Sequence, residues 1–221
     1  KEEIKKENID AVRDGASSNL YRHIRNLSNT QIPVIVSINK FSSDTDKEIA
    51  EISRIAMESG AFDVVLFDGF ANGGEGSVEL ADAVVNACEE FKNKGRKYKP
   101  IIDSGLPVEQ SILKIATNIY GAENVDFSPE AYRKMKKIED WGYGNLPVCM
   151  AKTQYSFSHD KNLLGSPSGF NIPVRDIRLN AGSGFVVAVC GSMMTMPGLP
   201  TRPAALDMDM NQDGDLTGVF S

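Results

Sequence analysis

Short apolar runs alternate along the first half of the chain with longer segments in which apolar residues recur every third or fourth position. The runs at residues 32–38 and 62–67 are β-branched or aromatic, a composition typical of buried strands. The periodic segments at residues 2–27, 45–60 and 78–91 predict helices, and Thr45 and Glu48 have the spacing of a capping box. Strand, helix, strand and helix in this order predict a right-handed parallel α/β unit.

The second half of the chain predicts two more helices and then a series of strands. The helices span residues 107–120 and 129–141, with Ser128 as N-cap and Gly142 as the stop of the second. Strand-like runs follow at residues 148–151, 172–179 and 184–190, and residues 206–210 and 216–220 predict a hairpin. We therefore predict an α/β fold with a mostly parallel sheet flanked by helices, formed by residues 1–203, and a C-terminal β-hairpin within residues 204–221.

Charge and composition exclude several classes of partner. Among 221 residues there are 24 basic and 30 acidic side chains, a net charge of −6, and no long basic block interleaves with aromatics. We therefore expect neither a nucleic-acid partner nor a membrane surface. The apolar runs are far shorter than the roughly 20 residues that a membrane helix needs. Cys88, Cys149 and Cys190 are isolated in the sequence and predict buried, reduced thiols and no metal site.

A rigid loop near the end of the chain is the first candidate for a binding segment. Residues 195–203 hold Pro or Gly at four of nine positions, which excludes a helix or a central strand. The loop directly follows the apolar run at residues 184–190, and ligands in open α/β sheets bind just beyond the carboxyl ends of such strands. The alternative is a loop that only closes the fold.

Two aromatic residues form a second candidate site. Phe41 follows the predicted strand that ends at Ile38, and Phe70 follows the one that ends at Phe67. Both rings would then lie at the carboxyl edge of one sheet, where a flat heterocycle could stack between them. The alternative is that both are core or lid residues.

Three cations form a weaker candidate set. Lys152 follows a short strand and could face a phosphate or carboxylate, or could lie on the surface. Arg175 and Arg178 lie on a strand-like alternation and could clamp an anion, although a structural pair with Asp176 explains them equally well. The sequence contains no Gly-Lys dipeptide, so it contains no phosphate-binding loop of the Walker A type.

Several segments together resemble the C-terminal part of formate–tetrahydrofolate ligase, also called 10-formyltetrahydrofolate synthetase. They occur in the same order over essentially the whole chain, at residues 39–45, 60–62, 73–74, 119–122, 144–155, 174–178 and 195–200. The resemblance implies a fold related to the P-loop NTPases. It also implies that the family's N-terminal portion, with its phosphate-binding loop, is missing, and that residues 204–221 pack on that portion.

The resemblance further implies an activity in one-carbon metabolism. The family joins formate to N10 of tetrahydrofolate with ATP, through formyl phosphate, and uses magnesium and a monovalent cation. Phe41 and Phe70 match the aromatics that stack on the pterin, although the family commonly has Trp at the second position, so Phe70 offers a smaller face. The segment that lines the adenine pocket matches Met196, Pro197, Gly198, Leu199 and Pro200. Lys152, Arg175 and Arg178 belong to matched motifs without an assigned role.

These implications define the expected partners. We expect formate, tetrahydrofolate and ATP as substrates, the N-terminal part of the same chain as a partner, homo-oligomers, and a cytoplasmic or mitochondrial-matrix location. The chain by itself is expected to be inactive, because the cradle for phosphoryl transfer would lie in the missing part. The alternative is a non-catalytic module that binds folate or mediates oligomerisation.

Overall fold

The protein is described here by a computed structural model, which describes residues 6–41, 43–191, 201–212, 214 and 216–218. The chain divides into two compact units, Lys1–Gly191 and Ser192–Ser221. The first unit contains two β-sheets, each associated with helices, and the second contains a small hairpin.

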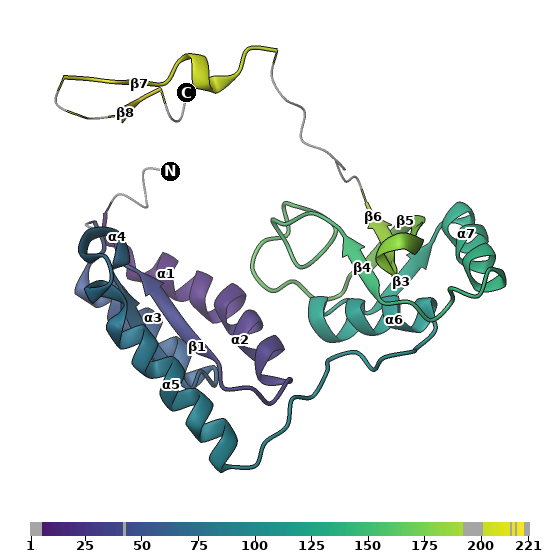
Figure 1. The fold of residues 1–221 in the computed structure, drawn as a ribbon, viewed down its shortest axis with the longest axis horizontal. Helices are drawn as coiled ribbons and strands as arrows, with labels where there is room; N and C mark the ends of the chain where they lie inside the picture. Colours follow the sequence, from purple (N-terminus) through teal and green to yellow (C-terminus); the bar gives the residue numbers. More distant parts are fainter. Residues whose placement is uncertain (1–5, 42, 192–200, 213, 215, 219–221) are drawn as a thin grey trace. The chain divides into compact units, whose positions relative to one another are not determined.

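The N-terminal helical segment is one continuous run of three pieces, α1 (Ile9–Gly15), a π-helical turn η2 (Ala16–Leu20) and α2 (Tyr21–Ser28), visible in Figure 1. The prediction of a helix from residue 2 was wrong at its start, because residues 6–8 lie before the first helical turn. Asn8 caps that turn: its side-chain oxygen accepts a hydrogen bond from the backbone N–H of Ala11 at 3.0 Å.

The first sheet pairs β1 (Ile35–Asn39) with β2 (Asp63–Phe67) in parallel, and α3 (Asp46–Glu58) connects them. The capping box of Thr45 and Glu48 is confirmed at the start of α3. A small core joins this sheet to α2 and α3 through Ile24, Val34 and Ala56. The predicted strand–helix–strand unit is therefore present, although β1 begins later than expected, beyond Pro33, which has no N–H to donate to a ladder.

The chain continues from β2 through α4 (Gly69–Asn72) and the short 3₁₀ turn η3 (Glu75–Ser77) to α5 (Val78–Asn93), which packs along both strands. The sequence spacing predicts that Val78, Ala81, Val84 or Val85, Cys88 and Phe91 form the inner face of this helix, and this prediction was wrong. Ala83 and Ala87 are its buried residues, whereas Val78, Val84 and Val85 are exposed. The helix is apolar on several faces, so spacing alone does not indicate its buried side, and two alanines allow a close approach to the strands.

The second sheet has four strands in the order β3-β5-β6-β4. Its strands are β3 (Asn124–Phe127), β4 (Val148–Ala151), β5 (Asn171–Asn180) and β6 (Phe185–Cys190), with the short 3₁₀ turn η5 (Ala181–Ser183) between the last two. β3 with β5 and β4 with β6 pair in parallel, whereas β5 and β6 are antiparallel. The predicted α/β class with mostly parallel pairing is confirmed, but the strands form two sheets and the second is mixed.

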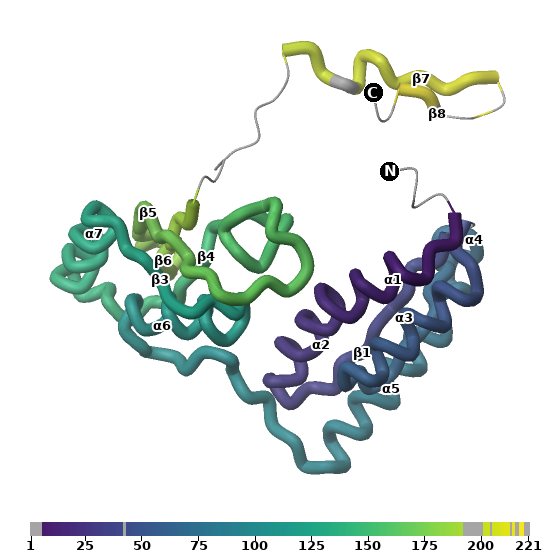
Figure 2. Tube along the Cα trace, turned by 180° about the vertical axis from the view of Figure 1, so that it is seen from behind, coloured from purple at the N-terminus to yellow at the C-terminus, as the bar shows by residue number. Residues whose placement is uncertain are grey.

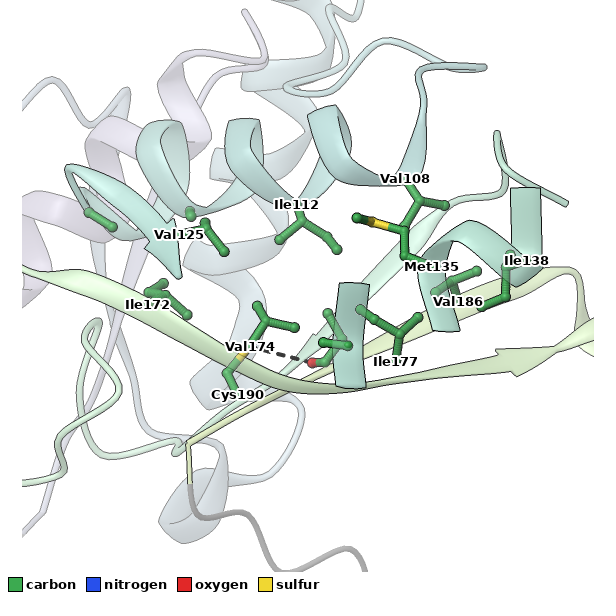
Figure 3. Packing of buried hydrophobic residues seen from close by; sticks show 14 of the residues in the cluster. Val108, Ile112, Val125, Met135, Ile138, Ile172, Val174, Ile177, Val186 and Cys190 are labelled. Atoms are coloured by element: carbon green, nitrogen blue, oxygen red, sulfur yellow. Dashed lines mark hydrogen bonds between the residues drawn. The ribbon is translucent and has the colours of Figure 1, made fainter. Parts of the chain in front are cut away.

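Two helices cover the second sheet (Figures 1 and 2), α6 (Val108–Ile115) and α7 (Pro129–Asp140). Helix α6 continues as the π-helical turn η4 (Ala116–Tyr120). Figure 3 shows Ile112 of α6 and Met135 of α7 in the same cluster as Ile172 and Val174 of β5. Cys190 is buried in this core, but Cys88 and Cys149 are exposed, so the prediction of three buried thiols holds for Cys190 alone.

The second unit contains a 3₁₀ turn, η6 (Ala204–Leu206), and two short antiparallel strands, β7 (Asp209–Met210) and β8 (Leu216–Thr217). The predicted C-terminal hairpin is thus confirmed in a shorter form. Its packing on another domain stays a prediction. In the part of the chain that the structure describes, no helix combines the length and apolar character required to cross a membrane.

An ion-pair network holds α1 against α3. The carboxylate of Glu51 on α3 accepts hydrogen bonds from Arg54 Nη2 at 2.8 Å and from Arg13 Nε of α1 at 2.7 Å. The hydrogen bond from Arg54 and then that from Arg13 lower the pKa of Glu51 to about 2. The charged carboxylate therefore stabilises the folded chain fully above about pH 4.5, the ordinary range of a glutamate, and less as the pH falls toward 2.

We expect Glu51→Gln to lower the melting temperature at pH 7, because the amide cannot pair with both guanidinium groups. The difference from the wild type should shrink as the pH falls below about 4, where the wild-type carboxylate begins to lose its charge. Glu58→Gln is the matched control, since the ion pair of Glu58 among the described residues is with Arg54 of the same helix. Melting curves of the three proteins between pH 3 and pH 7 test this; a Glu51→Gln deficit that is the same at every pH would contradict it.

Candidate functional site

The carboxyl ends of β1 and β2 lie side by side at one edge of the first sheet. Asn39 pairs with Phe67 in the register of the two strands, and the backbone N–H of Lys40 donates to the Phe67 carbonyl at 3.1 Å. The two loops that leave these strands therefore start from adjacent positions. Phe41 lies on the first loop and Phe70 on the second.

A tight turn holds Phe41 at the end of β1. Its backbone N–H donates to Asp44 Oδ2 at 2.8 Å, and its carbonyl accepts from the backbone N–H of Asp44 at 3.0 Å. These two bonds fix the backbone on both sides of the side chain. Phe41 as a whole residue is 63% exposed.

Phe70 lies on the single-turn helix α4, and the residue before this helix, Asp68, is bonded to the following turn η3. Asp68 donates its backbone N–H to the Gly76 carbonyl at 3.1 Å and accepts a bond from the Asn72 side chain at 2.9 Å. The ring of Phe70 is fully exposed. A fully exposed aromatic on a helix fixed by such contacts is available to a ligand, since it packs on no part of the core.

Both rings line one cavity of about 450 Å³, together with Asn39, Lys40, Asp68 and Ala71. This volume lies in the range of small-molecule sites. The exposure of both rings does not fit the alternative in which they are core residues. The cavity offers two aromatic faces, one cation and one carboxylate, a set that can stack on a flat ring and form polar contacts at its rim.

Sequence reasoning did not identify the polar residues of this cavity. Lys40 directly precedes Phe41, and Asn39 and Asp68 lie two positions before Phe41 and Phe70. This closeness in the sequence was the signal that could have identified them. Their side chains join the site because the two strands are paired in register, which the sequence alone does not specify.

Lys152 is not a surface cation. It follows β4 and is only 9% exposed, and its Nζ donates to the carbonyl of Thr153 at 2.9 Å and to the carbonyl of Ser156. The ammonium also lies 4.7 Å from the centre of the Tyr120 ring. Burial lowers the pKa of Lys152, and it raises the pKa of the neighbouring Cys190 thiol to about 12. Lys152 lines a different cavity from the two phenylalanines.

Arg175 and Arg178 are exposed on β5 and line neither the aromatic cavity nor that of Lys152. Arg178 Nε lies 3.3 Å from Asp176, and Lys134 Nζ of α7 lies 2.6 Å from the same carboxyl group. The hydrogen bond from Lys134 contributes most to lowering the pKa of Asp176. These contacts match the structural pair that the sequence left open for Arg178. The carbonyl of Arg175 accepts a bond from the Ser128 hydroxyl, which also caps α7.

The predicted nucleotide segment, Met196 to Pro200, lies outside the described residues, so its role stays a prediction. Within the part of the chain that is described, no group of three or more His, Cys, Asp or Glu side chains could hold a metal ion. The aromatic cavity is thus the candidate site that the described residues support best.

Comparison with protein families gives one match over nearly the whole chain. A family model described as formate–tetrahydrofolate ligase matches residues 1–220.

Proposed function

The chain belongs to the formate–tetrahydrofolate ligase family, and from this premise we propose that the cavity between Phe41 and Phe70 binds the pterin of tetrahydrofolate. The family uses formate, ATP and tetrahydrofolate in one-carbon metabolism. Of these molecules, the pterin and the adenine offer the flat ring systems that an aromatic pair can enclose. The observation that carries the proposal is that two exposed phenylalanines, from the ends of paired strands, line a single cavity.

The energetics of stacking favour a ring as the occupant. Two exposed phenyl rings lose contact with water when a flat ligand enters, and each stacking pair adds about 0.5–1.5 kcal/mol beyond the buried area. Lys40 and Asp68 lie at the same cavity and can pair with the polar edge of a pteridine. The fit therefore combines two apolar faces with hydrogen-bonding groups, as ligand sites commonly do.

In this proposal the chain's own residues bind and orient the folate, while phosphoryl transfer depends on groups outside it. Formation of formyl phosphate from formate and ATP needs a phosphate cradle, and this sequence contains no Gly-Lys loop. No acidic cluster among the described side chains fits a magnesium ion, so no step is assigned to one. The adenine pocket at Met196 to Pro200, homo-oligomer formation and a cytoplasmic or mitochondrial location stay predictions.

Titration calorimetry of the chain with tetrahydrofolate tests the proposal. We expect saturable 1:1 binding, and no comparable binding of p-aminobenzoylglutamate, which lacks the pterin. A coupled assay on the same protein should detect no formate-dependent ATP hydrolysis. Equal affinity for both ligands would contradict a pterin site, and turnover would contradict the assignment of phosphoryl transfer to groups outside the chain.

A further inference from the structure

A second cavity, of about 250 Å³, lies at the carboxyl end of β4 and shares no lining residue with the aromatic cavity. Asn19 of η2, His23 of α2 and Tyr120 of η4 line this cavity. The segment after β4, from Lys152 to Phe157, completes the wall. Elements far apart in the sequence therefore meet at this cavity.

Lys152 brings a positive charge to this cavity that no carboxylate of the described residues pairs with. Lys152 is 91% buried, and no carboxylate among the described residues lies within 4.0 Å of its ammonium group. Two carbonyls accept two of its three N–H donors, which leaves one donor for a further partner. A buried cation without a counter-ion is costly, and such groups are normally paired.

Phe157, which lines the same cavity as Lys152, lies beside one further cation, Arg22, and beside His23. The ring of His23 lies 4.9 Å from that of Phe157, and the guanidinium of Arg22 lies 5.9 Å from the centre of the same Phe157 ring. Arg22 Nε is buried and has no hydrogen-bond partner among the described residues. The amides of Asn19 and Gln154 line the cavity as well, and among the described residues no Asp or Glu does.

We propose that this cavity binds a small oxyanion, a carboxylate or phosphate group, which pairs with the ammonium of Lys152. The volume corresponds to several water molecules at about 30 Å³ each, so it accommodates one phosphate or a short-chain carboxylate but not a nucleotide or a folate. The oxygen atoms of an oxyanion are hydrogen-bond acceptors, and they match the N–H donors that line this cavity. The inference is independent of the proposed folate site, because it uses a different cavity and different residues.

Calorimetric titration with inorganic phosphate and with sodium acetate, at ionic strength held constant with sodium chloride, tests the site in the wild-type chain. We expect saturable binding of at least one of the two anions. Binding of phosphate alone identifies a phosphate site, and binding of acetate identifies a carboxylate site. The absence of binding for both anions would overturn the proposal.

Asn19→Asp tests whether the anion enters this cavity. Asn19 is exposed, and the nearly isosteric change places a carboxylate at the cavity wall, where it competes with the anion for Lys152. We expect at least a fivefold loss of anion affinity. Asn93→Asp, the same charge change at the exposed end of α5, is the control and should leave the affinity unchanged. Equal affinity in Asn19→Asp and Asn93→Asp would overturn the assignment.

A labelling measurement on the unmodified protein removes any dependence on variant folding. Reductive methylation followed by peptide mass spectrometry gives the reaction rates of Lys152 and of Lys161, an exposed lysine of the following loop. We expect the bound anion to slow methylation of Lys152 at least threefold relative to Lys161. An unchanged ratio at a saturating anion concentration would contradict contact between the anion and Lys152.

Discussion

Replacing Phe41 with alanine should weaken tetrahydrofolate binding at least tenfold and leave the melting temperature nearly unchanged. Phe41 is 63% exposed in the free chain, so removal of its ring opens no cavity in the core. In the complex the same change removes both the buried area of the ring and its stacking contact. These contributions together exceed the approximately 1.4 kcal/mol that corresponds to a tenfold change in affinity.

Calorimetry and thermal melting on the same samples test this expectation. Tyr98→Ala is the matched control, because Tyr98 is an aromatic of similar exposure, 59%, outside the cavity. Phe70→Trp tests the opposite change. The larger ring of tryptophan at position 70 should increase the affinity for tetrahydrofolate a few-fold. If Phe41→Ala binds as tightly as Tyr98→Ala, the pterin does not stack on Phe41.

Local chemistry explains what the sequence predicted correctly. The start of α3 is specified by Thr45 and Glu48, whose side chains cap the first helical turn. The end of β1 and the position of Phe41 follow from a short β-branched run, and the same holds for β2 and Phe70. Each of these features depends on residues within a few positions of one another, so a pattern in the sequence suffices to indicate it.

Features that depend on distant residues were predicted less well. β3 was not predicted, because it is only four residues long and becomes a strand by pairing with β5. The buried side of α5 is selected by the strands beneath it, since valines and alanines lie on several of its faces. The environment of Lys152 depends on Tyr120, a contact more than thirty positions away, so its burial is not visible in the sequence.

Gly76 fixes the loop that carries Phe70, and its substitution has the largest expected effect on stability among these variants. A Cβ added to Gly76 would lie 2.2 Å from the carbonyl oxygen and 2.5 Å from the carbonyl carbon of Asp68. Both are backbone atoms, so a rotamer change cannot relieve the clash. The loop must move, together with the hydrogen bond from Asp68 to Gly76.

We expect Gly76→Ala to cost about 2 kcal/mol or more, in the range of overpacked sites, and to lower the melting temperature by about 4–8 °C. Tetrahydrofolate binding should fall at least tenfold, because Asp68 and Phe70 lie on the displaced segment. Gly74→Ala is the matched control: Gly74 has a φ of −62° and an added Cβ meets nothing within 4 Å. It should keep both stability and affinity. If Gly76→Ala is destabilised but binds folate normally, the backbone contact supports the fold without setting the position of Phe70, which would contradict the predicted loss of affinity.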